Sequence, residues 1–177
     1  MNDILKKLSS YNLFNYLLPG TVFALVASST TNYEFMKPEL VTGAFFYYFL
    51  GLVISRIGSI IVEPMLKWLS IVKFQPYAEF LKAAAKDKKL EILSEANNTF
   101  RTLSALALSL LVLTFWAKLE SIWSILPDWT PTIVLIGLTI LLLFSYQKQT
   151  GYIFSRIEVV NATQMRPSKK SRAKKSQ

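Results

Sequence analysis

The amino-acid sequence predicts an all-α integral membrane protein with four transmembrane helices and a cytoplasmic helical hairpin between the second and the third. Three observations predict this class. The chain is 52% hydrophobic with a mean hydropathy of +0.35, which is more apolar than is usual for a soluble domain. It contains four apolar runs with aromatic residues near their ends. The net charges of the segments between these runs alternate in sign, as successive membrane crossings require.

The four apolar runs are each shorter than the roughly 20 residues of a full membrane span, and flanking residues extend them. With these extensions we expect transmembrane helices at 11–28, 39–57, 99–119 and 131–152. Trp and Tyr near the ends of the runs are typical of the membrane–water interface. They favour membrane spans over the alternative, which is a set of short buried helices in a soluble protein.

The charges of the connecting segments orient these spans. Segment 29–40 and segment 118–130, which holds Lys118, Glu120 and Asp128, each have a net charge of −1. Segment 56–101 has a net charge of +3, and the residues after Tyr146 have +7. Because basic connections remain on the cytoplasmic side, we expect a multi-pass protein of the bacterial cytoplasmic (inner) membrane. Its N-terminal segment 1–10 and its C-terminus are both predicted to lie in the cytoplasm.

The central segment, 58–98, is predicted to form amphipathic helices at the cytoplasmic surface. Plotted as a helix, residues 56–73 place most of their apolar side chains on one half and their charged side chains on the other. Pro64 predicts a kink, and Pro76 suits the first turn of a further helix. The apolar residues of that helix and of the segment after it form a candidate surface for a cytoplasmic protein partner: Tyr77, Phe80, Leu81, Leu90 and Leu93.

Two charged residues interrupt the end of the second apolar run. Arg56 and Glu63 lie seven residues apart and therefore share a helix face. A charge at bilayer depth costs about 3 kcal/mol or more, so one interpretation is an ion or proton pathway. The other interpretation is that both residues lie at the cytoplasmic boundary of the membrane. It is favoured because Arg56 lies about 27 Å along a helix that begins at Pro38, which is close to the full thickness of the hydrocarbon core. Arg101 has the same predicted depth and is a candidate partner for Glu63, so these three residues form a predicted membrane-interface junction.

Small and helix-bending residues in the first two predicted spans are candidates for helix packing or for lining a pore. An asparagine side chain can form hydrogen bonds between helices. Proline bends a membrane helix, and glycine lets two helices approach closely. The pattern favours packing. The residues are Asn15, Pro19, Gly20, Gly51 and Gly58.

The C-terminal segment 153–177 is predicted to be a basic cytoplasmic tail that is disordered from about residue 161. Contact with anionic lipid requires only electrostatic attraction. Nucleic acid is the alternative ligand, but the segment after Phe154 has no aromatic residue for base stacking. We therefore expect anionic lipid to contact the basic residues Lys169, Lys170, Arg172, Lys174 and Lys175.

Several chemistries are excluded by composition and motif. The chain has no cysteine and no histidine, which excludes disulfides, thiol catalysis, Cys/His zinc sites and imidazole acid–base catalysis. It also contains no glycine-rich phosphate loop, no GxSxG motif and no pair of carboxylates inside a span. We expect no enzymatic activity, no cofactor and no metal site.

Four segments within residues 11–104 contain distinctive elements, namely YNLFNYLLPG, GLVISRIGSIIVEPML, FQPYAEFLKAAAKDKKLEIL and EANNTFRT. With their SR-G…EP and NN…RT elements, these segments resemble a family of small uncharacterised bacterial inner-membrane proteins. Proteins of this kind occur as membrane components of phage-defence systems. The resemblance implies a role in antiviral defence, and it implies no catalytic residue.

The sequence thus predicts a non-enzymatic membrane effector or anchor. It would oligomerise and couple a cytoplasmic partner or signal to the membrane, with pore formation as one possible output. Two alternatives remain open. One is a small transporter or ion-channel subunit that uses Arg56 and Glu63. The other is a membrane scaffold whose surface 77–93 holds a cytoplasmic enzyme.

Overall fold

The computed structural model describes residues 13–164, with side chains from 15 to 162, and in this range the chain is all-helical without strands. This confirms the predicted all-α class. The helices, in which η denotes a π-helical turn, are η1 (Leu13–Leu17), α2 (Leu18–Thr30), α3 (Leu40–Ile57), η2 (Gly58–Val62), α4 (Glu63–Trp68), α5 (Tyr77–Ala84), α6 (Lys89–Ile122) and α7 (Leu126–Gln164).

Three continuous helices are long and apolar enough to cross a membrane, which indicates a membrane protein. They are Leu40–Trp68 with 29 residues, Lys89–Ile122 with 34 and Leu126–Ala162 with 37. At 1.5 Å per residue each is longer than the roughly 30 Å of a hydrocarbon core. In their most apolar windows only 33%, 17% and 6% of the residues are buried. Most of this apolar surface therefore requires an apolar environment outside the chain.

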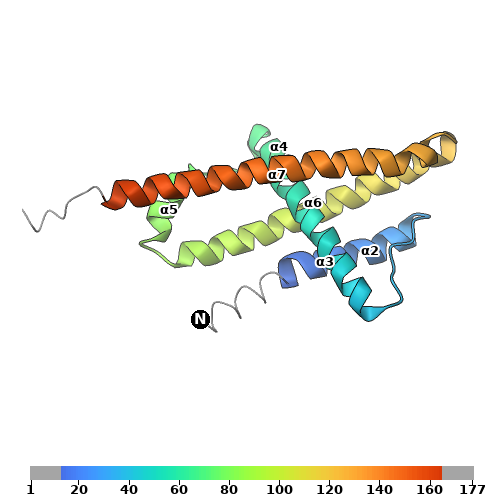
Figure 1. Cartoon of the computed structure of the whole chain (residues 1–177), viewed down its shortest axis with the longest axis horizontal. Helices are drawn as coiled ribbons and strands as arrows, with labels where there is room; N and C mark the ends of the chain where they lie inside the picture. The colour runs from blue at the N-terminus through green and yellow to red at the C-terminus, as the bar shows by residue number, and fades with distance from the viewer. Residues whose placement is uncertain (1–12, 165–177) are drawn as a thin grey trace, which may run out of the picture.

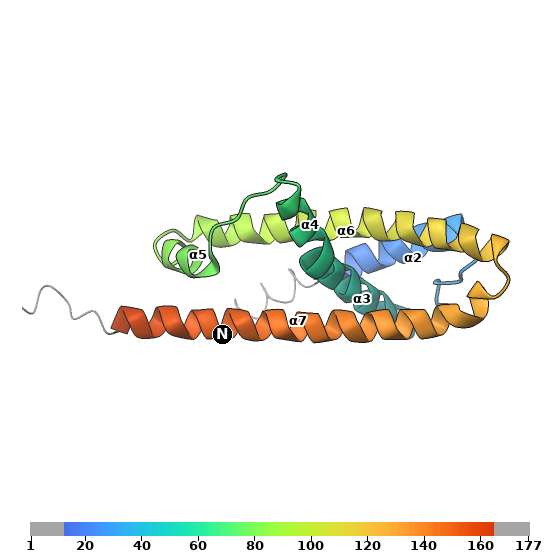
Figure 2. The ribbon, with the colours of Figure 1, turned by 90° about the horizontal axis from the view of Figure 1, so that it is seen from above.

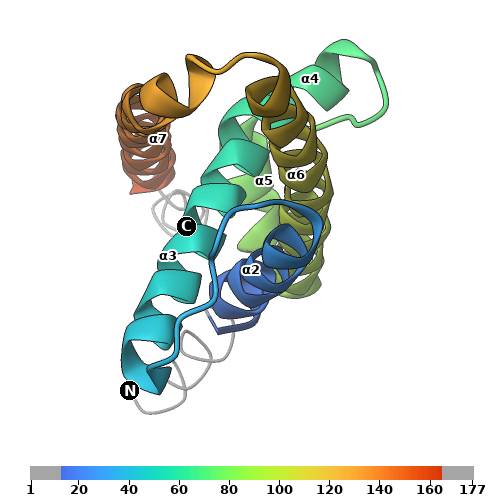
Figure 3. The same cartoon turned by 90° about the vertical axis from the view of Figure 1, so that its right-hand side faces the viewer.

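The two longest helices define the shape of the molecule. α6 and α7 run in opposite directions and are joined by the short connection 123–125 at one end (Figure 1). The continuous helix formed by α3, η2 and α4 crosses this pair and passes between its two members (Figure 2). α2 packs against α3 and α6 on one side, while α7 lies on the opposite side of α3 (Figure 3).

The helix boundaries differ from those predicted at several places. The helix that contains the predicted span 39–57 continues to Trp68. α6 contains the predicted span 99–119 and also begins ten residues earlier, at Lys89. α7 continues past the predicted end of the fourth span to Gln164, so residues 161–164 are helical rather than disordered. Hydropathy locates where the apolar character ends, whereas a helix continues for as long as its backbone hydrogen bonds and packing are favourable.

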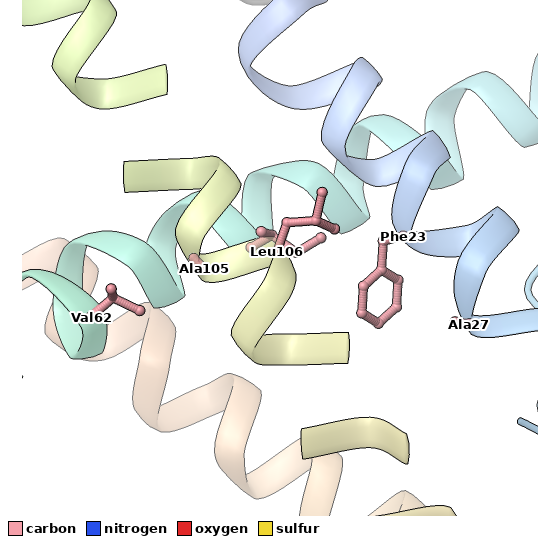
Figure 4. Packing of buried hydrophobic residues seen from close by; sticks show 6 residues of the cluster. Phe23, Ala27, Val62, Ala105 and Leu106 are labelled. Carbon is pink, nitrogen blue, oxygen red and sulfur yellow. The ribbon is translucent and has the colours of Figure 1, made fainter. Parts of the chain in front are cut away.

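The buried apolar core is small and lies where α2, α3, η2 and α6 meet. Phe23 and Ala27 of α2 lie on one side of Leu106 of α6, and Ala105 and Val62 continue the cluster on its other side towards η2 (Figure 4). Two of these five side chains are alanines, so the helices approach closely and bury little apolar area per contact. The core therefore specifies the arrangement of these helices without enclosing their outer faces.

Two glycines allow a close approach between the first helices and α3. A Cβ atom added to Gly20 would lie 1.7 Å from the Tyr47 carbonyl oxygen, and one added to Gly51 would lie 1.7 Å from the Tyr16 carbonyl oxygen. These distances leave no room for a methyl group. The helices are thus in backbone contact at two neighbouring points, which is the geometry that small residues provide in membrane helix pairs.

Candidate functional site

A backbone irregularity in η2 exposes one carbonyl group. The Glu63 N–H donates to the Gly58 carbonyl oxygen, five residues back rather than four. The Ser59 carbonyl therefore lacks its usual α-helical donor, and its π-helical donor would be Pro64, which has no N–H. The Lys148 ammonium of α7 donates a hydrogen bond to this carbonyl oxygen at 2.7 Å. The irregularity of one helix thus creates a docking point for another.

The Glu63 carboxylate is the centre of the candidate site. Its Oε1 accepts hydrogen bonds from Lys67 Nζ at 2.8 Å and from Lys148 Nζ at 3.4 Å. Its Oε2 accepts one from Arg101 Nη1 at 2.9 Å. We call these four residues the Glu63 cluster. Because they lie on α4, α6 and α7, one carboxylate joins three helices that are distant in sequence.

Burial makes the Glu63 cluster sensitive to the loss of any member. Glu63 is only 6% exposed. A carboxylate in such a position is stable as an anion only when cations and hydrogen-bond donors compensate for its lost hydration. Three cations surround it, so the cluster has a formal net charge of +2. The Glu63 cluster, also called the clamp below, therefore holds three helices together by ion pairs and has an excess of positive charge.

A buried hydroxyl group extends this polar region towards the first helix. Thr102, the residue after Arg101, is fully buried. Its Oγ1 donates to the Asn98 carbonyl oxygen at 2.9 Å and lies 3.3 Å from both Asn15 Oδ1 and Ser55 Oγ. Asn15 is itself only 3% exposed, and a buried amide of this kind is stable only when it has polar partners. η1, α3 and α6 are therefore joined by polar contacts next to the clamp.

A second carboxylate joins the helices at the opposite end of the α6–α7 pair. Glu120 accepts hydrogen bonds from the Tyr33 and Thr130 hydroxyl groups and from Trp116 Nε1. Burial, together with the hydrogen bond to Glu120, raises the pKa of Tyr33 to about 12. The phenol therefore remains protonated at neutral pH and continues to donate. We call these four residues the Glu120 cluster.

The two clusters are separated by the thickness of a bilayer. Arg101 and Glu120 are nineteen residues apart on α6, which is about 28 Å. Thr130 and Lys148 are eighteen residues apart on α7, which is about 27 Å. Between them α6 contains a single charged residue, Lys118, and α7 contains none. These lengths are close to the roughly 30 Å of a hydrocarbon core.

The structure brings together two of the three residues of the predicted junction. Glu63 and Arg101 form an ion pair, whereas Arg56 is not among the described cations that lie within 4 Å of Glu63. Lys67 and Lys148 provide the other cations. Lys148 lies as far from the connection 123–125 along α7 as Arg101 lies along α6. This equal spacing is the feature of the sequence that places Lys148 and Arg101 at the same level.

The residues predicted to pack helices occupy helix contacts. Gly20 and Gly51 lie where η1 and α2 meet α3, as described above, and Pro19 is buried in the first turn of α2. A Cβ atom added to Gly58 would lie 3.2 Å from Ala105 Cβ on α6. Asn15 contributes the polar contact to Thr102. In the described geometry, these residues therefore take part in contacts between helices.

The predicted partner surface is in part occupied by a contact within the chain, and its role towards a partner stays a prediction. The Tyr77 ring lies 4.6 Å from the Tyr152 ring of α7, measured between centroids, and 6.3 Å from the Phe80 ring. Leu81 and Leu90 are half-buried as well, whereas Leu93 is 63% exposed. An amphipathic pattern predicts that a helix covers an apolar surface, but it does not distinguish a surface of the same chain from that of a partner.

The predicted lipid-binding residues of the tail, Lys169 to Lys175, lie outside the described residues. Within residues 13–164 no group of three or more acidic side chains gathers to hold a metal ion. Comparison of the chain with protein-family models, with curated proteins and with solved structures finds no match. The proposals below therefore rest on the geometry of this chain and on the sequence patterns.

Proposed function

We propose that the protein is a non-enzymatic effector or anchor of a bacterial cytoplasmic membrane, in which the Glu63 cluster couples a cytoplasmic helical extension to the membrane-spanning segments. The single observation that carries the proposal is the position of this cluster. Glu63 joins α4, α6 and α7 at the point where the apolar segments end. α6 and α7 continue through this point without interruption.

The two clusters support a membrane placement with Glu63 at the cytoplasmic boundary. The segment between the two clusters has the length and composition of a span on both long helices. The described segments at the Glu120 end have net negative charge, while segment 56–101 has a net charge of +3. By the positive-inside pattern the Glu63 end faces the cytoplasm. With η1 and α2 as a further span, the chain crosses four times and both termini are cytoplasmic.

The oblique course of α3 is compatible with this placement. α3 crosses the α6–α7 pair (Figure 1), so these helices do not all stand upright in a bilayer. The continuous helix Leu40–Trp68 has 29 residues, about 43 Å. A helix of this length still crosses about 30 Å when it is tilted by about 45°. Its excess length is thus accounted for by tilt.

The cytoplasmic extension comprises α5 and the ends of α6 and α7 beyond the Glu63 cluster. Tyr77 of α5 packs against Tyr152, which is one helical turn after Lys148. A partner or signal that moves α5 would therefore move α7 next to the clamp. The exposed faces of the spans, above all α7, leave surface for other copies of the chain, so the proposed effector is an oligomer. A change in membrane permeability is its proposed output in antiviral defence.

Membrane potential tests this function. Overexpression of the wild-type chain should depolarise bacterial cells, as measured with a potential-sensitive dye. Glu63→Gln should abolish the depolarisation, because it removes the anion that joins the three helices. Glu79→Gln is the matched control, since Glu79 forms an exposed ion pair with Lys82, and this variant should depolarise cells as the wild type does. Membrane fractionation establishes that all variants are inserted at equal levels.

The transporter alternative gives a different pattern. It assigns a transport role to Arg56 as well as to Glu63, whereas in the structure Arg56 is outside the ion pairs of Glu63. Arg56→Gln should therefore leave the depolarisation intact if the clamp is the coupling element. Equal depolarisation by the wild type and Glu63→Gln, or no depolarisation at any expression level, would contradict the proposed effector function.

A further inference from the structure

A pocket of about 380 Å³ lies beside the Glu63 cluster, between the end of the α3–α4 helix and α7. Its walls change character along the helix axes. Phe144 of α7 and Ile60 of η2 line the part nearer to the apolar segments, whereas Lys67 and Lys148 line the part nearer to the extension. An apolar wall next to a cationic wall is complementary to an anionic lipid, whose acyl chains are apolar and whose phosphate is negatively charged.

The cations at this pocket are not neutralised within the described residues. Both oxygens of Glu63 are already occupied by three cations, and the cluster retains a formal charge of +2. In the same cluster, although outside the pocket lining, the buried Arg101 Nε has no hydrogen-bond partner in the described structure, so donors exceed acceptors in the Glu63 cluster. Lys67 has a side chain that is 43% exposed, and its ammonium lies 4.3 Å from the centre of the Phe74 ring. A further anion would relieve the excess charge.

We propose that this pocket binds the phosphate group of an anionic phospholipid from the cytoplasmic leaflet. Lys67 and Lys148 hold the phosphate, and Ile60 and Phe144 contact the glycerol and the first methylene groups of the acyl chains. A volume of about 380 Å³ is within the range of small-molecule sites and suffices for a glycerophosphate group. Bound there, the lipid makes the clamp sensitive to membrane composition.

This site differs from the lipid contact predicted for the C-terminal tail. The tail would attract a charged surface as a whole, with each basic residue near the surface contributing about 1 kcal/mol. The pocket instead has apolar and cationic walls that fit a single lipid molecule. The inference rests on the proposed function only for the membrane placement of the Glu63 end, and it requires neither an effector role nor a pore.

Native mass spectrometry of the full chain in detergent tests the site, with phosphatidylglycerol, phosphatidylcholine and inorganic phosphate as probes. The wild type should retain phosphatidylglycerol more tightly than phosphatidylcholine. Lys67→Gln should weaken phosphatidylglycerol retention about fivefold, which corresponds to the loss of one basic contact. Lys82→Gln removes the same charge outside the pocket and should leave retention unchanged. Lys148→Gln and Phe144→Ala, which alter the opposite wall, should also weaken it.

Each outcome decides the inference. Equal retention of phosphatidylglycerol by the wild type and by Lys67→Gln and Lys148→Gln would overturn it, as would equal retention of the two lipids by the wild type. If inorganic phosphate competes as strongly as phosphatidylglycerol, the pocket binds free phosphate and the lipid proposal is wrong. Cysteine labelling of the membrane topology, described below, separates the two proposals. If labelling gives the proposed placement and lipid retention is insensitive to Lys67, the lipid site alone is wrong.

Discussion

At the scale of single residues, Glu63 is the position with the largest predicted effect on stability. Its side chain is 7% exposed and lies within 4 Å of three cations. Glu63→Gln keeps the shape of the side chain but leaves these cations without an anion. Removing one partner from a buried ionic group typically costs about 3 kcal/mol. We expect a loss of this size in the free energy of unfolding, measured by circular dichroism during denaturant titration in detergent.

The control for this prediction is Glu79→Gln. Glu79 and Lys82 have side chains that are 59% and 53% exposed, and an exposed ion pair of this kind contributes less than about 1 kcal/mol. This variant should unfold within about 0.5 kcal/mol of the wild type. Similar losses in both variants would show that Glu63 is not held as the structure indicates.

Sequence reasoning reached part of the Glu63 cluster. The depth of Glu63 and Arg101 at the ends of two apolar runs suffices to propose their pairing. Lys148 was missed because the predicted fourth span, 131–152, placed it inside the apolar segment instead of at its end. The Ser59 carbonyl, which accepts a hydrogen bond from Lys148, was missed for a different reason. Pro64 predicts a kink, but the sequence does not show that the missing N–H combines with a π turn to expose that carbonyl.

At the scale of helices, the contact of η1 and α2 with α3 depends on two glycines. In Gly51→Ala a Cβ atom would overlap the Tyr16 carbonyl oxygen, so the helices would have to separate along their closest contact. Overpacking of this kind costs about 1–3 kcal/mol. We expect Gly51→Ala, and likewise Gly20→Ala, to lower the midpoint of thermal unfolding in detergent, as followed by circular dichroism.

Gly137 provides the matched control for these glycine substitutions. It lies within α7 and has nothing within 4 Å of an added Cβ atom. Gly137→Ala should be neutral or slightly stabilising, since alanine is favoured over glycine in helices by about 1 kcal/mol. If Gly51→Ala is also neutral, the close approach of η1 and α3 is incorrect.

The predicted membrane spans are confirmed in part, and the lengths of the helices differ from those predicted. Four apolar runs lead to four expected spans, and three helices meet the length and hydropathy required for a crossing. The first predicted span corresponds to η1 and α2, and α2 itself has 13 residues. The extensions of α6 and α7 beyond the apolar runs follow from tertiary contacts, such as Tyr77 against Tyr152, which a hydropathy pattern does not contain.

At the scale of the whole molecule, the two carboxylate clusters define a slab of bilayer thickness. The Glu120 cluster has one carboxylate and neutral donors, whereas the Glu63 cluster has three cations around one carboxylate. This asymmetry matches the positive-inside pattern. Both clusters also connect helices that are far apart in sequence. In the proposed placement, the same residues therefore mark the membrane boundaries and hold the helices together.

The central claim is that the chain crosses the membrane with the Glu63 end in the cytoplasm, and cysteine labelling tests it most directly. The chain has no cysteine, so single substitutions report without background. In intact cells a membrane-impermeant maleimide should label Ser124→Cys, which lies in the connection at the Glu120 end. It should label Ala85→Cys, which follows α5, only after the cells are permeabilised. Labelling of Ala85→Cys in intact cells, with Ser124→Cys protected, would contradict the account.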